Sequence, residues 1–281
     1  MQVALQQQDY VLFSEELKKY YPQIYNELSE ILSHHNVRHG VLKGTADYWC
    51  RDYMPIQVDY DRFVQFRYHP DYLKGYETPT DVSLELAKKL TSVSIETSPI
   101  VADGGNFTFA SIKRGRGYTP VVVMTEKVFF ENSEVAGENL VYQLEKLFPK
   151  HKLLFLPWDA CGHTDGILHA VGPNKLLVNL KVYPDKIAAR MREILESCFK
   201  VIDLELSDYH EYSWAYINMI HTKDVIIVPG LGRATDAEAL NHIKKLFPQY
   251  EGWIYQVQIP SIVKKYGGAL NCLSWSFYKY L

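Results

Sequence analysis

Cysteine is scarce in this chain, with four residues among 281: Cys50, Cys161, Cys198 and Cys272. They are too few and too far apart for a disulfide framework. The sequence has no C-x-x-C motif of the kind found in zinc sites and redox-active disulfides. Reduced thiols in a cytoplasmic setting are therefore expected.

An excess of charge of one sign is also missing, because 30 Lys and Arg face 33 Asp and Glu, for a net charge of −3. Without a basic field, nucleic acid is not an expected partner. No apolar run reaches the roughly 18 residues of a membrane span. The first residues, MQVALQQQDYVLF, have neither the basic start nor the apolar core of a signal peptide. We therefore expect a cytoplasmic protein that does not enter a membrane.

The glycine and proline contents are low, at 16 and 13 residues, while 47% of the chain is apolar and 22% is charged. This balance excludes collagen-like and disordered chains and is typical of a folded globular protein. The length allows one large domain or two ordinary ones.

Five stretches carry apolar residues at helical spacing: Ser14–His34, Asp81–Leu90, Gly137–Phe148, Lys186–Phe199 and Asp236–Phe247. After each comes a short run rich in β-branched or apolar residues: Val37–Leu42, Val93–Ile95, Leu153–Leu156, Val201–Leu204 and Ile254–Ile259. A polar string of small residues then enters a further strand, and return strands such as Lys175–Leu180 and Val225–Val228 follow.

The polar strings recur at a nearly constant interval. Their marker residues are 51, 60, 55 and 54 positions apart: Asp52, Asp103, His163, Asn218 and Cys272. Five units of about 55 residues, each with strands and one helix, indicate a repeat architecture. We predict one domain over residues 1–281, a five-bladed pseudo-symmetric α/β propeller whose polar strings meet on the central axis. Two α/β domains with accidental spacing are the alternative.

Such a ring would gather a set of reactive side chains at one site: Asp52, Asp103, His163, Asp165 and Cys272, with Trp49, Asn106 and Asn218 nearby. If His163 and Asp165 lie in a strand, their side chains share a face. Asp52 and Asp165 could each accept two hydrogen bonds from a guanidinium, whose planar N–H donors match a carboxylate.

The guanidinium carbon resists attack, so a soft and strong nucleophile is required, and the Cys272 thiolate has that character beside imidazolium or the substrate cation. His163 would protonate the departing ammonia and then activate the water that cleaves a thiouronium intermediate. Asp103 would orient His163. This chemistry requires neither a metal nor an organic cofactor.

The ordered strings WCRDYMP, DGGN, DACGHTDG, WAYINMI and GGALNC resemble the agmatine deiminase and bacterial-type peptidylarginine deiminase family. The resemblance implies a five-bladed α/β propeller that hydrolyses a guanidino group to a ureido group and ammonia. By this resemblance Cys272 is the nucleophile, His163 the acid and base, Asp52 and Asp165 the guanidinium clamps, and Trp49 an aromatic residue of the substrate channel.

Three positions depart from the family pattern: Asp103 replaces a Glu, Met54 a Gly, and Asn271 a His. Agmatine, converted to N-carbamoylputrescine, is the expected substrate, with its amine near Asp47, Glu211 or Tyr212. Arginine or peptidyl-arginine is the alternative guanidine, and the peptide would require an open groove. A homodimer is an open possibility.

Two other classes of function fit the same residues. A zinc hydrolase would use Cys161, His163, Asp165 and Cys272 as ligands, although the usual short ligand spacings are missing. A non-catalytic relative would bind guanidines through Asp52 and Trp49 without turnover.

Overall fold

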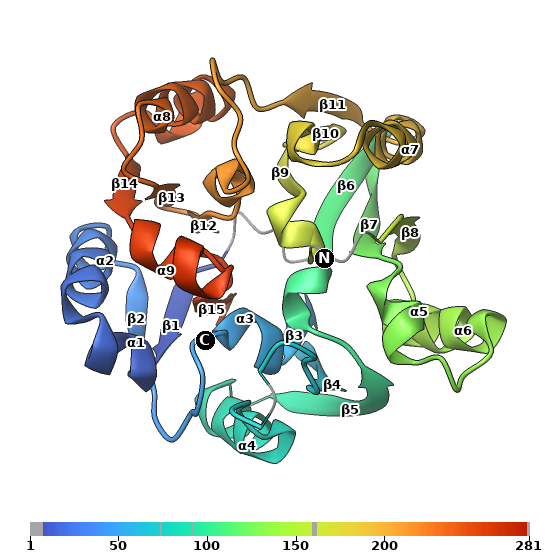
Figure 1. Ribbon diagram of the computed structural model, residues 1–281. Helices are drawn as coiled ribbons and strands as arrows, with labels where there is room; N and C mark the ends of the chain where they lie inside the picture. Colours follow the sequence, from blue (N-terminus) through green and yellow to red (C-terminus); the bar gives the residue numbers. More distant parts are fainter. Residues whose placement is uncertain (1–7, 74, 92, 159–161, 280–281) are drawn as a thin grey trace.

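The computed structural model describes residues 8–73, 75–91, 93–158 and 162–279. Over these residues the chain forms five three-stranded sheets arranged as a ring, with helices around the outside (Figure 1). This is the five-bladed α/β propeller predicted from the repeat, with one sheet for each unit of about 55 residues.

Four sheets, or blades, are built from strands that are consecutive in the sequence. They are β3 (Ile56–Asp59), β4 (Arg62–Arg67) and β5 (Ser94–Val101); β6 (Thr108–Arg114), β7 (Gly117–Thr125) and β8 (Lys152–Leu156); β9 (Leu168–Gly172), β10 (Lys175–Val178) and β11 (Lys200–Asp203); and β12 (Ile220–His221), β13 (Ile226–Gly230) and β14 (Ile254–Gln258). In each blade the first two strands pair antiparallel and the last two pair parallel. A parallel pair needs a long crossover connection, which explains the helix in every unit.

The fifth blade joins the two ends of the chain. Strand β15 (Ser274–Phe277) pairs antiparallel with β1 (Tyr10–Ser14), which pairs parallel with β2 (Arg38–Leu42). The register places Tyr10 opposite Phe277, and their rings stack with centroids 5.0 Å apart. Because the last strand completes the first sheet, the ring is closed by hydrogen bonds between its two ends.

The crossover helices lie outside the ring (Figure 1): α1 (Glu15–Tyr20) with α2 (Pro22–His34), α4 (Thr80–Thr91), α6 (Gly137–Leu147), α7 (Asp185–Glu196) and α8 (Thr235–Leu246). The predicted helices are confirmed to within a few residues, except that Ser14–His34 is two helices. Pro22 begins the second helix because its ring suits a first helical turn and cannot continue the helix before it. Three short helices lacked a sequence signal: α3 (Cys50–Tyr53), α5 (Lys127–Glu131) and α9 (Pro260–Tyr266).

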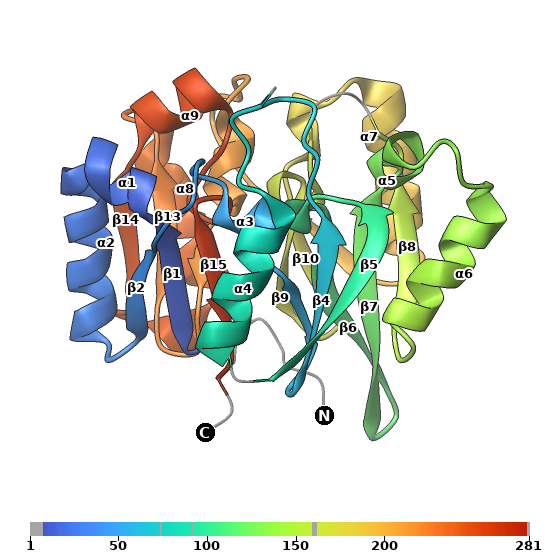
Figure 2. The same cartoon turned by 90° about the horizontal axis from the view of Figure 1, so that it is seen from below.

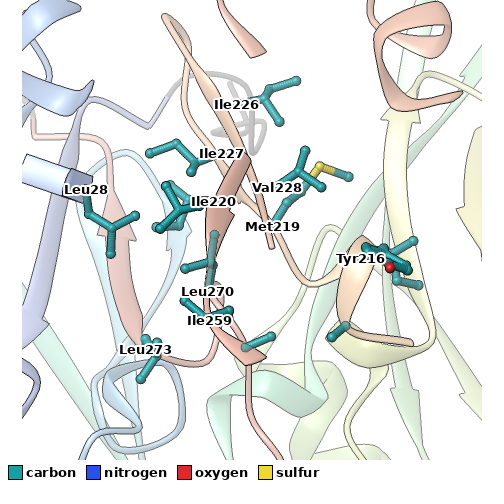
Figure 3. Packing of buried hydrophobic residues seen from close by; sticks show 14 of the residues in the cluster. Leu28, Tyr216, Met219, Ile220, Ile226, Ile227, Val228, Ile259, Leu270 and Leu273 are labelled. Atoms are coloured by element: carbon teal, nitrogen blue, oxygen red, sulfur yellow. The ribbon is translucent and has the colours of Figure 1, made fainter. Parts of the chain in front are cut away.

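Apolar side chains fill the space between adjacent blades. Ile226, Ile227 and Val228 of β13 have no exposed surface and share one cluster with Leu28 of α2 and Leu270 (Figure 3). A strand that is covered on both faces reads as a continuous apolar run, as β13 does. Within the described residues no helix has the length and apolar character to cross a membrane.

Candidate active site

The segment before the first strand of each blade carries one of the predicted site residues. Asp52 lies in α3 before β3, Asp103 directly before the 3-10 turn η2 (Gly104–Asn106), and His163 directly before η3 (Thr164–Gly166). Asn218 follows η5 (Ser213–Ile217), and Cys272 lies between α9 and β15. In the side view of Figure 2, α3 and α9 lie toward one end of the ring and the turn of the β6–β7 hairpin lies at the other.

Gly105 marks the point where three of these segments meet. A β-carbon on this residue would lie 2.7 Å from Oδ1 of Asp52, 2.9 Å from Nδ1 of His163 and 3.2 Å from Oδ2 of Asp165. Side-chain atoms from two sequence-distant segments therefore converge on a third segment at Gly105, as the repeat predicted. Only glycine leaves room for that convergence, since any side chain there would displace the reactive groups.

A cavity of about 500 Å³ opens over this point, and Asp52, His163, Asp165 and Cys272 all line it. Six aromatic side chains form much of the remaining wall: Trp49, Tyr72, Trp158, Tyr183, Trp214 and Tyr266. The wall thus uses three of the five tryptophans of the chain. A cavity with converging polar groups and an aromatic wall is the usual form of a small-molecule site.

The Cys272 sulfur is held at the cavity by a buried amide. Oδ1 of Asn218 accepts hydrogen bonds from the backbone N–H groups of Asn271 (3.0 Å) and Cys272 (3.2 Å), and lies 3.4 Å from Sγ. Sγ is also 3.6 Å from Oδ2 of Asp165. Burial, followed by the charges of Asp165 and Asp52, raises the pKa of Cys272 well above its ordinary value. Burial and these charges therefore favour the thiol over the thiolate.

His163 lies between two carboxylates. Its Nε2 is 2.9 Å from Oδ2 of Asp103, and its Nδ1 is 3.4 Å from Oδ1 of Asp52. Asp103 therefore reaches the ring although its side chain is one methylene shorter than Glu. Burial lowers the pKa of His163, but Asp52 and Asp103 outweigh this effect and raise the pKa to about 9. At neutral pH the ring is an imidazolium.

The two predicted guanidinium clamps have different supports. Asp52 is 6% exposed, and it accepts hydrogen bonds from the Gly105 N–H (2.9 Å) and the Tyr72 hydroxyl (3.0 Å). Burial raises its pKa to about 7, with nearby Asp103 and Asp165 adding to this shift and His163 opposing it. Oδ2 of Asp165 accepts a hydrogen bond of 2.8 Å from the Asn271 side chain. Asn271, one of the departures from the family pattern, thus holds a clamp in place.

Trp49 lines the cavity, and two glycines allow its position. Gly267 ends α9 in the left-handed region, with φ of 72°. A β-carbon on Gly268 would lie 2.1 Å from Cζ3 of the Trp49 ring. The double glycine therefore turns the chain and lets the indole pack directly on the backbone.

Asn106 and Asn218 do not line the cavity, so their predicted contact with substrate is corrected to a positioning role. Oδ1 of Asn106 accepts hydrogen bonds from the backbone N–H (2.9 Å) and the hydroxyl (2.8 Å) of Thr125, and both asparagines are buried. An amide with such bonds braces the loops that carry Asp103 and Cys272.

Other expectations also need correction. Asp165 lies in a 3-10 turn with His163 as its N-cap, not in a strand, so the strand periodicity was the wrong reason for placing both at one site. None of the three residues expected near a substrate amine lines the cavity: Asp47, Glu211 and Tyr212. Asp47 is buried and bonds the backbone N–H groups of Trp49 (2.8 Å) and Thr78 (2.7 Å).

The zinc alternative draws on one residue, Cys161, that lies outside the described residues. Among the residues that are described, no group of three or more His, Cys, Asp or Glu side chains is arranged to hold a metal ion. Sequence reasoning also missed Lys127 and Tyr72, which line the cavity. No sequence signal pointed to Lys127, because the five-residue helix α5 that it begins is too short for a periodic pattern.

A family model described as Porphyromonas-type peptidyl-arginine deiminase matches residues 4–277. The chain belongs to this family. It is thus a guanidino-group deiminase, the class of enzyme that the motifs predicted. No curated protein matches the chain closely enough to count as a relative.

Solved structures confirm the fold at low sequence identity. Agmatine deiminase from C. jejuni is 18% identical with a TM-score of 0.75, over 98% of this chain and 94% of that one. Agmatine deiminase from Enterococcus faecalis is 17% identical with a TM-score of 0.70, over 98% and 94%. DDAH from Pseudomonas aeruginosa, in complex with citrulline, is 14% identical with a TM-score of 0.63, over 96% and 100%.

Proposed function

We propose that this deiminase hydrolyses agmatine to N-carbamoylputrescine and ammonia through a covalent intermediate on Cys272. The convergence of Asp52, His163 and Asp165 on one point beside the Cys272 sulfur is the observation that carries the proposal. A planar guanidinium suits two carboxylates that line one cavity, because its N–H groups can donate paired hydrogen bonds to each.

Substrate binding would generate the nucleophile. The guanidinium compensates the negative charges of Asp165 and Asp52, which help to raise the pKa of the Cys272 thiol. Once these charges are paired with a cation, the thiol gives its proton to solvent, and the resulting thiolate adds to the guanidinium carbon.

His163 would then move two protons. As an imidazolium it gives a proton to the departing nitrogen, which leaves as ammonia and produces the thiouronium. The neutral ring, bonded to Asp103 through Nε2, next takes a proton from water. That water attacks the same carbon and releases the ureido product and the Cys272 sulfur.

The aromatic wall supports a small cationic substrate over a peptide. Aromatic faces attract an ammonium, and Trp49, Trp158 and Trp214 surround a cavity suited to a molecule of agmatine's size. The substrate-bound agmatine deiminase among the similar structures favours the same choice. Peptidyl-arginine, after which the family is named, is the second candidate.

We further propose that residues 1–281 act as one catalytic domain, because each of the five blades supplies a residue that forms or positions the site. The cytoplasmic location stays a prediction, and a homodimer stays an open possibility.

Ammonia release from a panel of guanidines tests the proposal: agmatine, arginine and an arginyl peptide. We expect turnover of agmatine that Cys272→Ser and His163→Ala abolish, while Cys272→Ser still binds substrate within a few-fold. Cys198→Ser is the matched control because Cys198 does not line the cavity, and it should keep full activity. Binding without turnover of any guanidine would identify a non-catalytic relative, and activity lost to chelators would favour the zinc hydrolase.

A further inference from the structure

A chain of buried charges lies behind His163, and the mechanism above uses only its first member, Asp103. Lys127 begins α5, and Glu131 lies one turn later on the same helix. The side chains of Asp103, Lys127 and Glu131 are 0%, 6% and 12% exposed. Burying an ammonium at a helix start opposes both solvation and the helix dipole, so its partners must compensate that cost.

Lys127 and His163 bond to the same oxygen atom. Nζ of Lys127 lies 2.6 Å from Oδ2 of Asp103, and Nε2 of His163 lies 2.9 Å from it. The other oxygen, Oδ1, is buried and has no hydrogen-bond partner among the described residues. On its far side Lys127 pairs with Glu131 at 2.5 Å. The order of contacts is therefore Glu131, Lys127, Asp103, His163.

We propose that Lys127 is a positioning residue that holds the Asp103 carboxylate against His163 and shares its negative charge. His163 can then both release and take back a proton during turnover. This inference rests on the proposed function of His163 as acid and base. It adds a residue to which no role in the reaction has been assigned above.

The charges around His163 show why this sharing matters. Asp52 and Asp103 stabilise the imidazolium, and the Lys127 ammonium acts in the opposite direction. If Asp103 were paired with His163 alone, the imidazolium would be a weaker acid toward the departing nitrogen. A shared carboxylate still orients the ring but holds its proton less strongly.

The groups that face Lys127 keep it charged. Burial lowers its pKa, but Asp103 and Glu131 outweigh this and hold the pKa above its ordinary value. Asp71 is 3.7 Å away but 70% exposed, so water screens its charge, and the Tyr72 ring centroid lies 5.9 Å from Nζ. Burial and the charge of Asp103 raise the pKa of Glu131 to about 7, so Glu131 is only partly ionised near neutrality.

Three variants separate a role in proton transfer from a role in folding. Lys127→Arg keeps the charge. Lys127→Met removes it, so that Glu131 loses its ammonium partner and Asp103 keeps His163 as a partner, and this variant is expected to unfold more readily. The double variant Lys127→Met with Glu131→Gln also replaces the partly ionised Glu131 carboxyl with a neutral amide of similar size, which reduces the loss of stability. Lys150→Met is the control, because Lys150 pairs with Asp59 at 2.8 Å on the surface.

The test is the pH dependence of kcat for ammonia release, together with an NMR titration of the His163 ring in the enzyme without substrate. In the double variant we expect the alkaline limb and the ring titration to move up by about 1 pH unit, with kcat at neutral pH about tenfold lower. Lys127→Arg and Lys150→Met should keep both close to the parent values.

An unmoved ring titration in the folded double variant would overturn the proposal, as would a kcat that falls equally at every pH. Failure of this proposal can be distinguished from failure of the proposed function, because the ring titration needs no turnover. If the parent protein releases no ammonia from any guanidine, the proposed function fails, and the titration still decides whether Lys127 tunes His163.

Discussion

Asn218 gives the sharpest test of how the nucleophile is held. It is 1% exposed, and its Oδ1 accepts the backbone N–H groups of Asn271 and Cys272 while its Nδ2 donates to the Asp165 carbonyl at 3.2 Å. Asn218→Ala leaves the Cys272 N–H without an acceptor, whereas the Asn271 N–H keeps the backbone carbonyl of residue 218 at 3.1 Å. One buried N–H left without an acceptor costs about 1–3 kcal/mol of unfolding free energy. That is a measurable part of a typical domain's stability.

Asn218→Asp separates stability from catalysis. The carboxylate still accepts both N–H groups, so less stability is lost, but it brings a negative charge to the position 3.4 Å from Sγ. That charge raises the thiol pKa further, and each unit costs about tenfold in thiolate population. We expect kcat/KM to fall at least about tenfold while the midpoint of urea unfolding changes less than in Asn218→Ala.

Thr222→Val is the matched control for these measurements. Its hydroxyl accepts the backbone N–H groups of Asp224 (3.3 Å) and Val225 (3.1 Å), in the turn between β12 and β13. It should lose comparable stability and keep its kcat. If Asn218→Ala were as stable and as active as the parent protein, the reasoning that this amide holds Cys272 would be refuted.

Two further predictions concern the same cavity. Asp52 must be ionised to bind a guanidinium and His163 protonated to act as an acid, and their pKa values are about 7 and about 9. The profile of kcat/KM should therefore rise through the first value and fall through the second, and a profile flat across both would contradict these roles. Gly268→Ala forces the Trp49 ring to move, at a cost of about 1–3 kcal/mol, and should raise KM for agmatine. Gly252→Ala, a left-handed glycine with open space around it, is the control, and an unchanged KM in Gly268→Ala would remove Trp49 from the binding site.

Much of the fold could be predicted from the sequence because the same pattern of helix, strand and polar string occurs five times. Helices at a regular spacing, each followed by a buried strand and a polar string, pointed to five similar units. Marker residues at nearly constant intervals then placed Asp52, Asp103, His163 and Cys272 at equivalent positions. The fold brings Asp52, His163 and Cys272 to one cavity, and Asp103 bonds to His163. A repeat carries this information since equivalent positions of a closed ring must face the same axis.

Short elements were harder to predict. Helix α5 has five residues, too few for a periodic pattern, so the sequence offered no reason to place Lys127 beside Asp103. His163 and Asp165 were expected in a strand and lie instead at a 3-10 turn, since three residues cannot distinguish the two by periodicity.

The sequence by itself determined the residue types and the order of the blades, because both follow from local pattern and spacing. Tertiary structure alone decided which side chains face the cavity and which brace it. The sequence predicted that Asn106 and Asn218 contact the substrate. In the fold both side chains instead accept hydrogen bonds that hold loops of the site in place. It also decided the charge states of Asp52, His163 and Cys272, because a pKa depends on burial and on charges brought close from distant parts of the chain.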